Sequence, residues 1–440
     1  MSLLIKGATL LSGKRVDILI EGSIISKVAP SISARAEEKI DANGKIALPG
    51  LINTHTHAAM TLFRGVGEDA SLHDWLSAVR AVEVKVTPSQ IRAGTSLAVA
   101  EMIKSGTTCF NDMYFHMDEV ASAVQESGMR AVLGYSMVDM GDGKFQEEFS
   151  RSGASKGELH YDEKKRKLEL KIAEQFIKDW QRKADGRITT AVPPHSLYLC
   201  SKELLTASRD MAKKYSVPLH IHLSETRKEV FDCLSQHKLR PVPYLDSLGI
   251  LSQRTVAAHC VWLTKEEVRV LSERKVSASL CPVSNMKLAG GAVAPLPEMQ
   301  QFKMNVSLGT DGSASNDSLS MFETMKFLAL TVKNARWDAT LASAPKVLSA
   351  ATEGGARALG INAGEIAEGK LADIILIDAR APNMAPLHDI TANLVYSAHA
   401  GNVTDSIING KVVMRERKLL LLDEEKVVDA AQKEAEKLVA

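Results

Sequence analysis

The sequence has few cysteines, and they are not arranged in pairs. The five are Cys109, Cys200, Cys233, Cys260 and Cys281, an odd number that includes no Cys-x-x-Cys pair. Disulfide frameworks and structural zinc ribbons both need paired cysteines at characteristic spacings. The sequence therefore argues against both kinds of stabilisation.

Long apolar segments and an excess of one charge are also missing. No segment approaches the roughly 20 uninterrupted apolar residues that a membrane span needs. Residues 1–7 show no basic region followed by a long apolar stretch, so no signal peptide is visible. The formal net charge of +1 gives no reason to expect nucleic acid or an anionic membrane as a partner. We therefore expect a cytoplasmic protein.

Both ends of the chain are rich in short strands separated by turns. With 440 residues, 45% of them hydrophobic, the chain can form one large domain and a smaller one. Strand-like runs occur within residues 1–49 and return after residue 364, where Asn409-Gly410 is a strong hairpin signal. We expect residues 1–49 and 364–440 to pair as one composite β-sandwich, with a helix over residues 424–438.

Between these ends, residues 50–363 alternate strand-like and helix-length segments. Eight such units favour a (β/α)8 barrel over an open doubly wound sheet. No Gly-x-Gly-x-x-Gly or Walker-type loop follows a strand, which argues against a nucleotide-phosphate site. The segment 141–163 is long and charged and is predicted to act as a lid. The candidate strands are residues 46–57, 107–112, 131–138, 188–194, 218–224, 255–259, 276–281 and 305–310.

Five residues at or near the ends of candidate strands fit one metal site: His55, His57, His222, His259 and Asp311. A barrel gathers the carboxyl ends of its strands around one mouth, so these residues can meet. Alternate residues of a strand face the same side, which allows two ligands from one strand. Neutral imidazoles with a carboxylate suit a hydrolytic zinc or similar divalent ion that keeps one position open for water.

Two further residues of this region have alternative interpretations. His220 repeats the two-residue spacing with His222, but His222 is nearer the strand end and is the preferred ligand. Glu225 is either a carboxylate at a helix start or a proton shuttle. A hydrolytic metal lowers the pKa of its bound water from about 16 to about 7. Asp311 would then accept the water's proton and His259 would polarise the carbon under attack, which predicts hydrolytic displacement at an sp² carbon.

Several motifs together resemble the amidohydrolase superfamily, and within it most closely the methylthioadenosine/S-adenosylhomocysteine deaminases and 5′-deoxyadenosine deaminases. The resemblance implies one divalent metal ion held by the counterparts of His55, His57, His222 and Asp311, with zinc expected and iron or manganese as alternatives. It also implies a small-molecule nucleoside substrate and a homo-oligomer. The motifs are residues 49–57, 222–226, 258–260 and 309–316, and the resemblance also includes residues 369–373 near the C-terminal β region.

The same resemblance places substrate contacts on three residues. His195 resembles the histidine that meets the ribose, Trp75 lies in the region that stacks on the nucleoside, and Glu83 resembles the glutamate that binds sugar hydroxyls. Trp75 as core and Glu83 as a surface helix residue remain alternatives. Several relatives have an arginine where this chain has Tyr135. A carboxylate substituent favours a bidentate guanidinium, so the preferred 5′-substituent stays open.

Three functions therefore compete. The first is a deaminase of 5′-substituted adenosines that releases ammonia and the inosine analogue. The second is a related hydrolase acting on a free base or heterocycle of the guanine, cytosine or chlorotriazine type. The third is a metal-dependent binding or assembly protein without catalysis, which the joint presence of Glu225, His259 and Asp311 disfavours.

Overall fold

The middle of the chain forms a closed barrel of eight parallel strands. The computed structural model describes residues 2–70, 72–141 and 161–439. The barrel strands follow the order β10-β11-β12-β13-β6-β7-β8-β9, and every neighbouring pair is parallel. Parallel bridges from Val192 to Leu219 and from Ser196 to His222 connect the last strand to the first. The predicted (β/α)8 barrel is confirmed.

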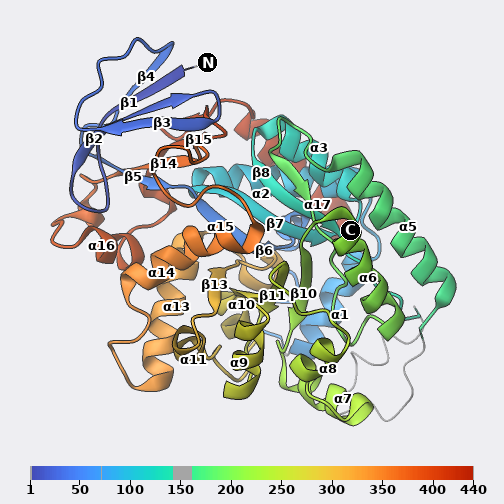
Figure 1. The fold of residues 1–440 in the computed structure, drawn as a ribbon. Helices are drawn as coiled ribbons and strands as arrows, with labels where there is room; N and C mark the ends of the chain where they lie inside the picture. Colours follow the sequence, from blue (N-terminus) through green and yellow to red (C-terminus); the bar gives the residue numbers. More distant parts are fainter. Residues whose placement is uncertain (1, 71, 142–160, 440) are drawn as a thin grey trace.

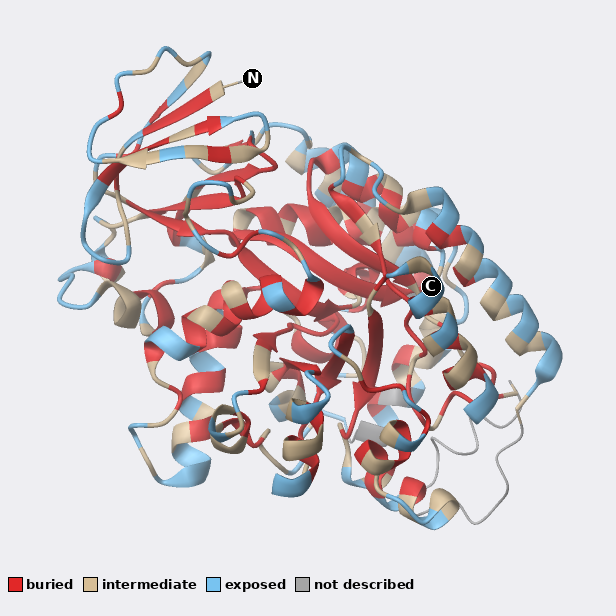
Figure 2. Cartoon of the chain, viewed as in Figure 1, coloured by how far each residue is buried: buried red, intermediate tan, exposed pale blue. Residues whose placement is uncertain are grey.

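The barrel strands coincide with the eight predicted segments, with one difference. The segment 46–57 is divided at Gly50, so its first half belongs to another sheet. Every residue of β6, β7, β10 and β11 is buried, as expected for parallel strands covered on both faces (Figure 2). The barrel strands are β6 (Leu51–Thr56), β7 (Thr107–Tyr114), β8 (Arg130–Tyr135), β9 (Ile188–Thr190), β10 (Leu219–Leu223), β11 (Thr255–His259), β12 (Ser277–Leu280) and β13 (Asn305–Leu308).

Helices surround the barrel on its outer side (Figure 1). The helix predicted over residues 424–438 appears as α17. The helices are α1 (Leu72–Glu83), α2 (Pro88–Lys104), α3 (Met117–Ser127), α5 (Glu163–Trp180), α6 (Lys202–Tyr215), α7 (Arg227–His237), α8 (Pro241–Ser247), α9 (Lys265–Glu273), α10 (Pro282–Lys287), α11 (Leu296–Gln301), α12 (Ser313–Asn316), α13 (Met321–Arg336), α14 (Ala344–Ala351), α15 (Glu353–Leu359), α16 (Ile390–Tyr396) and α17 (Glu424–Val439).

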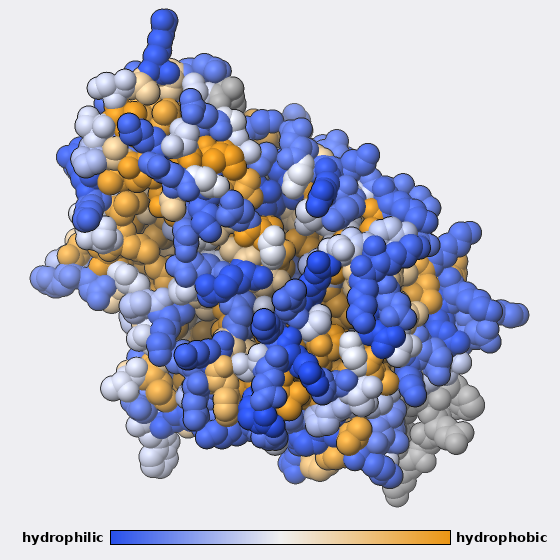
Figure 3. Space-filling model, viewed as in Figure 1, coloured by the Kyte–Doolittle hydropathy of each residue, from blue (hydrophilic) through white to orange (hydrophobic). Residues whose placement is uncertain are grey.

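The two ends of the chain combine into a second sheet of nine strands, here called the terminal sheet. Its order is β17-β16-β15-β14-β5-β1-β2-β3, with β4 beside β1, and the two ends meet where β5 pairs with β14. The sheet has its own hydrophobic cluster, and Figure 3 shows apolar residues grouped over it. Its strands are β1 (Ser2–Thr9), β2 (Arg15–Glu21), β3 (Ile24–Ala29), β4 (Glu38–Asp41), β5 (Lys45–Pro49), β14 (Ile374–Asp378), β15 (Val403–Ile408), β16 (Lys411–Arg415) and β17 (Lys418–Leu419).

The predicted hairpin turn lies between β15 and β16. Asn409 and Gly410 have φ angles of 54° and 76°, the left-handed conformations that a tight two-residue turn requires. A Cβ atom on Gly410 would lie 2.0 Å from the carbonyl oxygen of Gly22, so only glycine fits there. The turn therefore packs against the N-terminal strands of the terminal sheet.

A buried ion pair joins the terminal sheet to the barrel. Arg130, the first residue of β8, donates from Nε to Asp373 Oδ2 at 2.7 Å and from Nη2 to Asp373 Oδ1 at 3.2 Å. Arg130 Nη2 also donates to Asn409 Oδ1 at 2.9 Å. Both charged side chains are almost fully buried, at 6% and 2% exposure. The bidentate geometry fixes how the two sheets meet.

Two further predictions concern membrane-spanning segments and the lid. Among the described residues, no helix is long and apolar enough to cross a membrane. Residues 142–160 of the predicted lid segment 141–163 lie outside the described residues. The role of that segment as a lid stays a prediction.

Candidate metal centre

Barrel closure brings the predicted metal residues to the carboxyl ends of the strands. His55 and His57 come from β6 and the residue after it, His222 from β10, His259 from the end of β11, and Asp311 follows β13. Nitrogen atoms of His55, His57 and His222 lie within 4.8 Å of one another. The same limit holds for ligand atoms of His55, His259 and Asp311. Residues from four strands therefore meet at one point, as the sequence predicts.

The spacing of these atoms fits a divalent metal ion. His55 Nε2 and His57 Nε2 lie 3.4 Å and 3.3 Å from Asp311 Oδ1. In a tetrahedral site with bonds of about 2.0–2.1 Å, neighbouring ligand atoms are about 3.3–3.4 Å apart. The Nε2 atom of His55 is buried and has no hydrogen-bond partner among the described residues. A buried polar atom without a partner is costly, and a metal ion would satisfy it.

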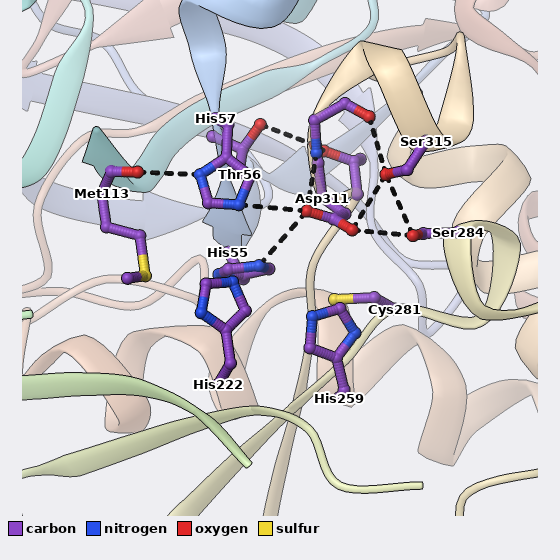
Figure 4. Close-up of polar contacts among 12 residues, drawn as sticks. His55, Thr56, His57, Met113, His222, His259, Cys281, Ser284, Asp311 and Ser315 are labelled. Atoms are coloured by element: carbon purple, nitrogen blue, oxygen red, sulfur yellow. Dashed lines mark hydrogen bonds and ion pairs between the residues drawn. The ribbon is translucent and has the colours of Figure 1, made fainter. Parts of the chain in front are cut away.

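Outer partners orient two of the imidazoles towards the centre. His57 Nδ1 donates to the carbonyl oxygen of Met113 at 2.8 Å, and His222 Nδ1 donates to the carbonyl oxygen of His195 at 2.7 Å. Figure 4 shows the other side of the His57 ring facing Asp311. Such bonds leave the Nε2 lone pair free for a metal, the usual arrangement around histidine ligands.

His220 lies behind His55 in the barrel. Its Nε2 atom is 2.9 Å from His55 Nδ1, and its Nδ1 atom is 3.1 Å from Asn111 Nδ2. The ring is fully buried. His220 thus contacts the Nδ1 atom of the ligand candidate His55 and is not itself one of the grouped metal-ligand candidates.

The Asp311 carboxylate is held by three donors. Oδ1 accepts from the backbone N–H of Gly312 at 2.8 Å, and Oδ2 accepts from the hydroxyls of Ser284 and Ser315 at 2.7 Å and 2.9 Å. Burial alone would raise the pKa of Asp311, but the neighbouring imidazoles outweigh it and hold the pKa well below its usual range. The group is therefore ionised and its orientation is fixed.

Four of the surrounding histidines have a lowered pKa and are neutral near pH 7. Burial is the main cause, and it lowers the pKa of both His222 and His259 to about 4. Burial also lowers the pKa of His55 and His195 well below the usual value. Neutral imidazole is the form that binds metal ions, so His55 and His222 need not lose a proton before a cation binds.

Glu225 and His259 face each other beside the ligand candidates. Glu225 Oε2 lies 3.8 Å from His259 Nε2. Burial raises the pKa of Glu225 to about 7, which suits a group that gains and loses a proton at neutral pH. Asn285 Nδ2 donates to His259 Nδ1 at 3.1 Å, which leaves the imidazole proton on Nε2. The His259 side chain therefore presents an N–H donor to the centre.

Four residues at the same strand ends have strained backbone conformations. Ser224, His259, Cys260 and Asp311 have φ angles of 50°, 70°, 52° and 63°, in the left-handed region. Each such residue costs on the order of 1–3 kcal/mol, and such strain is typical of functional sites. These values therefore agree with a site at this end of the barrel.

Two predicted sugar-binding residues lie beside the metal candidates. The ring of His195 is 4.4 Å from the ring of His222. Glu83, at the end of α1, accepts from the hydroxyl of Tyr114 at 2.8 Å, and the ring of Tyr114 is 6.0 Å from that of His57. The structure thus connects Glu83 to the centre through a single aromatic side chain.

Trp75 is buried at the start of α1 and packs in the main hydrophobic core. Its indole N–H donates to the carbonyl oxygen of Ala314 at 3.1 Å, three residues after Asp311. Both the core role and a position at the mouth are therefore compatible with its surroundings.

Tyr135, which stands where several relatives have an arginine, donates from its hydroxyl to Glu169 Oε1 at 3.3 Å.

Sequence reasoning missed the residues that hold the site in place. Ser284 and Asn285 follow β12 and contact Asp311 and His259, yet nothing in their local pattern distinguishes them from an ordinary helix start. Ser315 lies inside a quoted motif but had no assigned contact. Tyr114 could not have been paired with Glu83 without the barrel topology.

Comparisons with known proteins agree with this geometry. The model of the amidohydrolase family matches residues 46–413. The chain belongs to the amidohydrolase family. This amidohydrolase is 44% identical over 441 residues to the 5′-deoxyadenosine deaminase of Methanosphaera stadtmanae, with 99% of each chain covered. It is 45% identical over 425 residues to the 5′-deoxyadenosine deaminase of Methanocaldococcus jannaschii, with 96% of each covered.

Solved structures of similar chains include two enzymes with bound zinc. An adenosine deaminase from Xanthomonas campestris with bound zinc has a TM-score of 0.89 and 31% identity, and covers 99% of this chain and 98% of its own. An atrazine chlorohydrolase from Arthrobacter aurescens complexed with zinc has a TM-score of 0.89 and 25% identity, with 98% of this chain and 100% of its own covered. The metal-centre geometry and these neighbours together support a divalent metal ion in this amidohydrolase.

Proposed function

We propose that this amidohydrolase is a hydrolytic deaminase of adenosine-type nucleosides. It would replace the amino group at C6 of 5′-deoxyadenosine, 5′-methylthioadenosine, S-adenosylhomocysteine or adenosine, giving ammonia and the inosine analogue. The main support is the metal-binding geometry beside Glu225, whose carboxyl group has a pKa raised to about 7. In addition, 99% of the chain aligns with a 5′-deoxyadenosine deaminase.

His55, His57, His222 and Asp311 are proposed to hold one divalent ion, zinc in the first instance. The ion, when bound, supplies a water whose pKa is lowered to about 7. The zinc found in two similar structures supports this choice of ion. Replacement of His222 by alanine should strip the metal and abolish turnover. Elemental analysis of the pure protein tests the assignment, and full activity in the presence of a chelator would contradict it.

Glu225, His259 and Asp311 are proposed to move protons and polarise the base. Glu225 would transfer a proton to the ring nitrogen next to C6, because its pKa lies near the working pH. His259 would donate its Nε2–H to the oxygen that attacks C6. Asp311, ionised and fixed by three donors, would accept a proton from the attacking water.

Glu83, His195 and Trp75 are proposed to bind the nucleoside. Glu83 and His195 would pair with sugar hydroxyls and Trp75 would stack on the nucleoside. Support comes from the position of His195 against His222, and from the bond between Glu83 and Tyr114. In this proposal the sugar contacts would lie beside the groups that act on the base.

An absorbance assay on the zinc-loaded protein tests the function. The panel comprises 5′-deoxyadenosine, methylthioadenosine, S-adenosylhomocysteine, adenosine, adenine, guanine, cytosine and a chlorotriazine. We expect kcat/KM to be highest for one of the adenosine-type nucleosides. Turnover confined to a free base or to the chlorotriazine would overturn the proposal and assign the chain to another branch of the family. The chlorotriazine is included because the chain is similar to an atrazine chlorohydrolase.

A further inference from the structure

A buried glutamate lies one turn beyond Glu225, and the proposed mechanism does not use it. Glu229 is the third residue of α7 and is 2% exposed. Its backbone N–H donates to the hydroxyl of Thr226, the residue that caps α7, at 3.1 Å. A threonine cap followed three residues later by a glutamate is the pattern of a capping box.

The Glu229 carboxylate departs from that pattern. In a capping box the glutamate accepts from the N–H of the cap residue itself. Here Oε1 accepts from the N–H of Ser224 at 2.7 Å, and Oε2 accepts from the N–H of Glu225 at 2.8 Å. Both oxygens therefore bind the backbone of the segment that carries the Glu225 side chain.

The segment that Glu229 holds is strained. Ser224 has a φ angle of 50°, which is unfavourable for a serine. The segment directly follows β10 and begins two residues after His222, so its backbone sets the direction of the Glu225 side chain relative to the centre. Two hydrogen bonds to a buried carboxylate stabilise this conformation against more extended ones.

A second buried glutamate provides a contrast. Glu267 is 3% exposed at the third position of α9, and its helix is capped by Thr264. Its Oε2 accepts from the N–H of Thr264 at 2.9 Å and from Arg240 Nε at 2.8 Å. Glu267 thus forms the usual capping box and contacts no backbone next to Glu225.

We propose that Glu229 is a positioning residue that fixes the Ser224–Glu225 backbone so that the Glu225 carboxyl stays beside His259 at the metal centre. The catalytic consequence rests on the proposed role of Glu225 as the proton shuttle. A displacement of about 1 Å in a catalytic group can cost on the order of 10²-fold in rate, so the loss of one backbone bond should be visible in kcat.

The test compares Glu229→Gln with Glu267→Gln in the zinc-loaded full chain. Glutamine at 229 keeps one acceptor oxygen but turns an NH2 group towards the other backbone N–H. We expect kcat for 5′-deoxyadenosine to fall about 10- to 100-fold, on the scale of a misplaced catalytic group. KM and zinc content should stay near the wild-type values. Glu267→Gln also neutralises a buried helix-capping carboxylate, here opposite Arg240, but its remaining oxygen can keep the bonds that Oε2 accepts. It should leave kcat within about 2-fold of wild type, as expected for a purely structural change.

Amide hydrogen exchange provides a readout that does not depend on activity. In Glu229→Gln, peptides that contain residues 224 and 225 should exchange faster, while the same peptides in Glu267→Gln should match the wild type. Unchanged exchange and unchanged kcat in Glu229→Gln would overturn the inference, and so would equal losses of kcat in both variants. If the wild type fails to deaminate any nucleoside, the proposed function fails, whereas the exchange data still decide whether Glu229 holds this backbone.

Discussion

The single residue on which the proposed chemistry depends most is Glu225. Its carboxyl group is partly buried, lies 3.8 Å from His259 Nε2 and has a pKa raised to about 7. Glu225→Gln keeps the size of the side chain but removes the exchangeable proton. We expect kcat to fall by about 10²-fold or more, the scale of general acid–base catalysis, with metal and fold retained. Steady-state kinetics with parallel zinc analysis measures this, and a fully active variant would return Glu225 to a role at the helix start.

The same residue should link stability to pH in the metal-free protein. Burial raises the pKa of Glu225 from its usual 4.5 to about 7, so the folded chain binds this proton more tightly than the unfolded chain does. The stabilising contribution is then fully present below about pH 4.5 and is lost as the pH rises through about 7. Metal-free Glu225→Gln should exceed metal-free wild type in stability by on the order of 1–2 kcal/mol at pH 8.

Thermal unfolding at pH 5 and pH 8 checks this linkage in chelator-treated samples. The variant's advantage at pH 8 should shrink towards pH 5, because wild-type Glu225 is largely protonated there in the folded state. A difference that does not change between the two pH values would show that Glu225 is not the titrating group.

At the residue scale, the sequence predicts what local spacing encodes. His55, His57, His222 and Asp311 could be singled out because each lies at or near the end of an apolar strand. Their outer partners could not, because the carbonyl of Met113 and the hydroxyl of Ser284 reach the site through the barrel rather than through a local pattern. The catalytic and binding roles assigned to the site residues stay predictions that the variants above test.

At the scale of elements, the barrel strands were predictable because they are continuous apolar runs with turn residues between them. The error in segment 46–57 has a local cause. A Cβ atom on Gly50 would lie 2.0 Å from Thr108 Oγ1, so the chain passes close to β7 there. The apolar pattern continues through Gly50, so periodicity alone gave one strand across the expected domain boundary between residues 49 and 50.

Helix α1 is tied to the barrel mouth near both of its ends, and this supports its proposed role in sugar recognition. Trp75 donates to Ala314 near the start of the helix, and Glu83 accepts from Tyr114 at its end. A site built to pair with hydroxyls rejects substrates that lack them, because its own polar groups stay unpaired. The position of Glu83 therefore predicts a preference for nucleosides over free adenine.

Replacing Glu83 with alanine should remove much of that preference. We expect kcat/KM for 5′-deoxyadenosine to fall by about 10²-fold while zinc content is unchanged, and Tyr114→Phe to give a smaller loss because it only frees the Glu83 side chain. Ser77→Ala, on an exposed position of α1, is the matched control. Equal kcat/KM for adenine and the nucleosides in the wild type would contradict sugar recognition by this helix.

At the scale of the whole molecule, residues from both ends of the chain form one sheet that is anchored to the barrel. The strand signals at each end were visible in the sequence. The pairing of β5 with β14, however, joins segments more than 300 residues apart, and it could only be inferred because both ends consist of short strands separated by turns. The buried contact between Arg130 and Asp373 left no local signal, because the two residues are 243 positions apart in the sequence and meet only in the folded chain.

This contact should make the terminal sheet important for the stability of the barrel. Asp373→Asn keeps the shape of the side chain but leaves the Arg130 charge buried without its carboxylate, and removing one partner of such a pair costs about 3–5 kcal/mol. We expect the denaturant midpoint to fall accordingly.

Glu38→Gln is the matched control. The ion pair between Arg415 and Glu38 is about one-third exposed, at 35% and 30%, and should contribute about 1 kcal/mol or less to stability. The double variant Arg130→Met/Asp373→Leu should recover only part of the loss, because apolar side chains often replace a buried ion pair without cost, but the backbone N–H of Asn409 loses the bond of 2.7 Å that it donates to Asp373 Oδ1. Equal midpoints for Asp373→Asn and Glu38→Gln would show that the two sheets are held together by apolar packing instead.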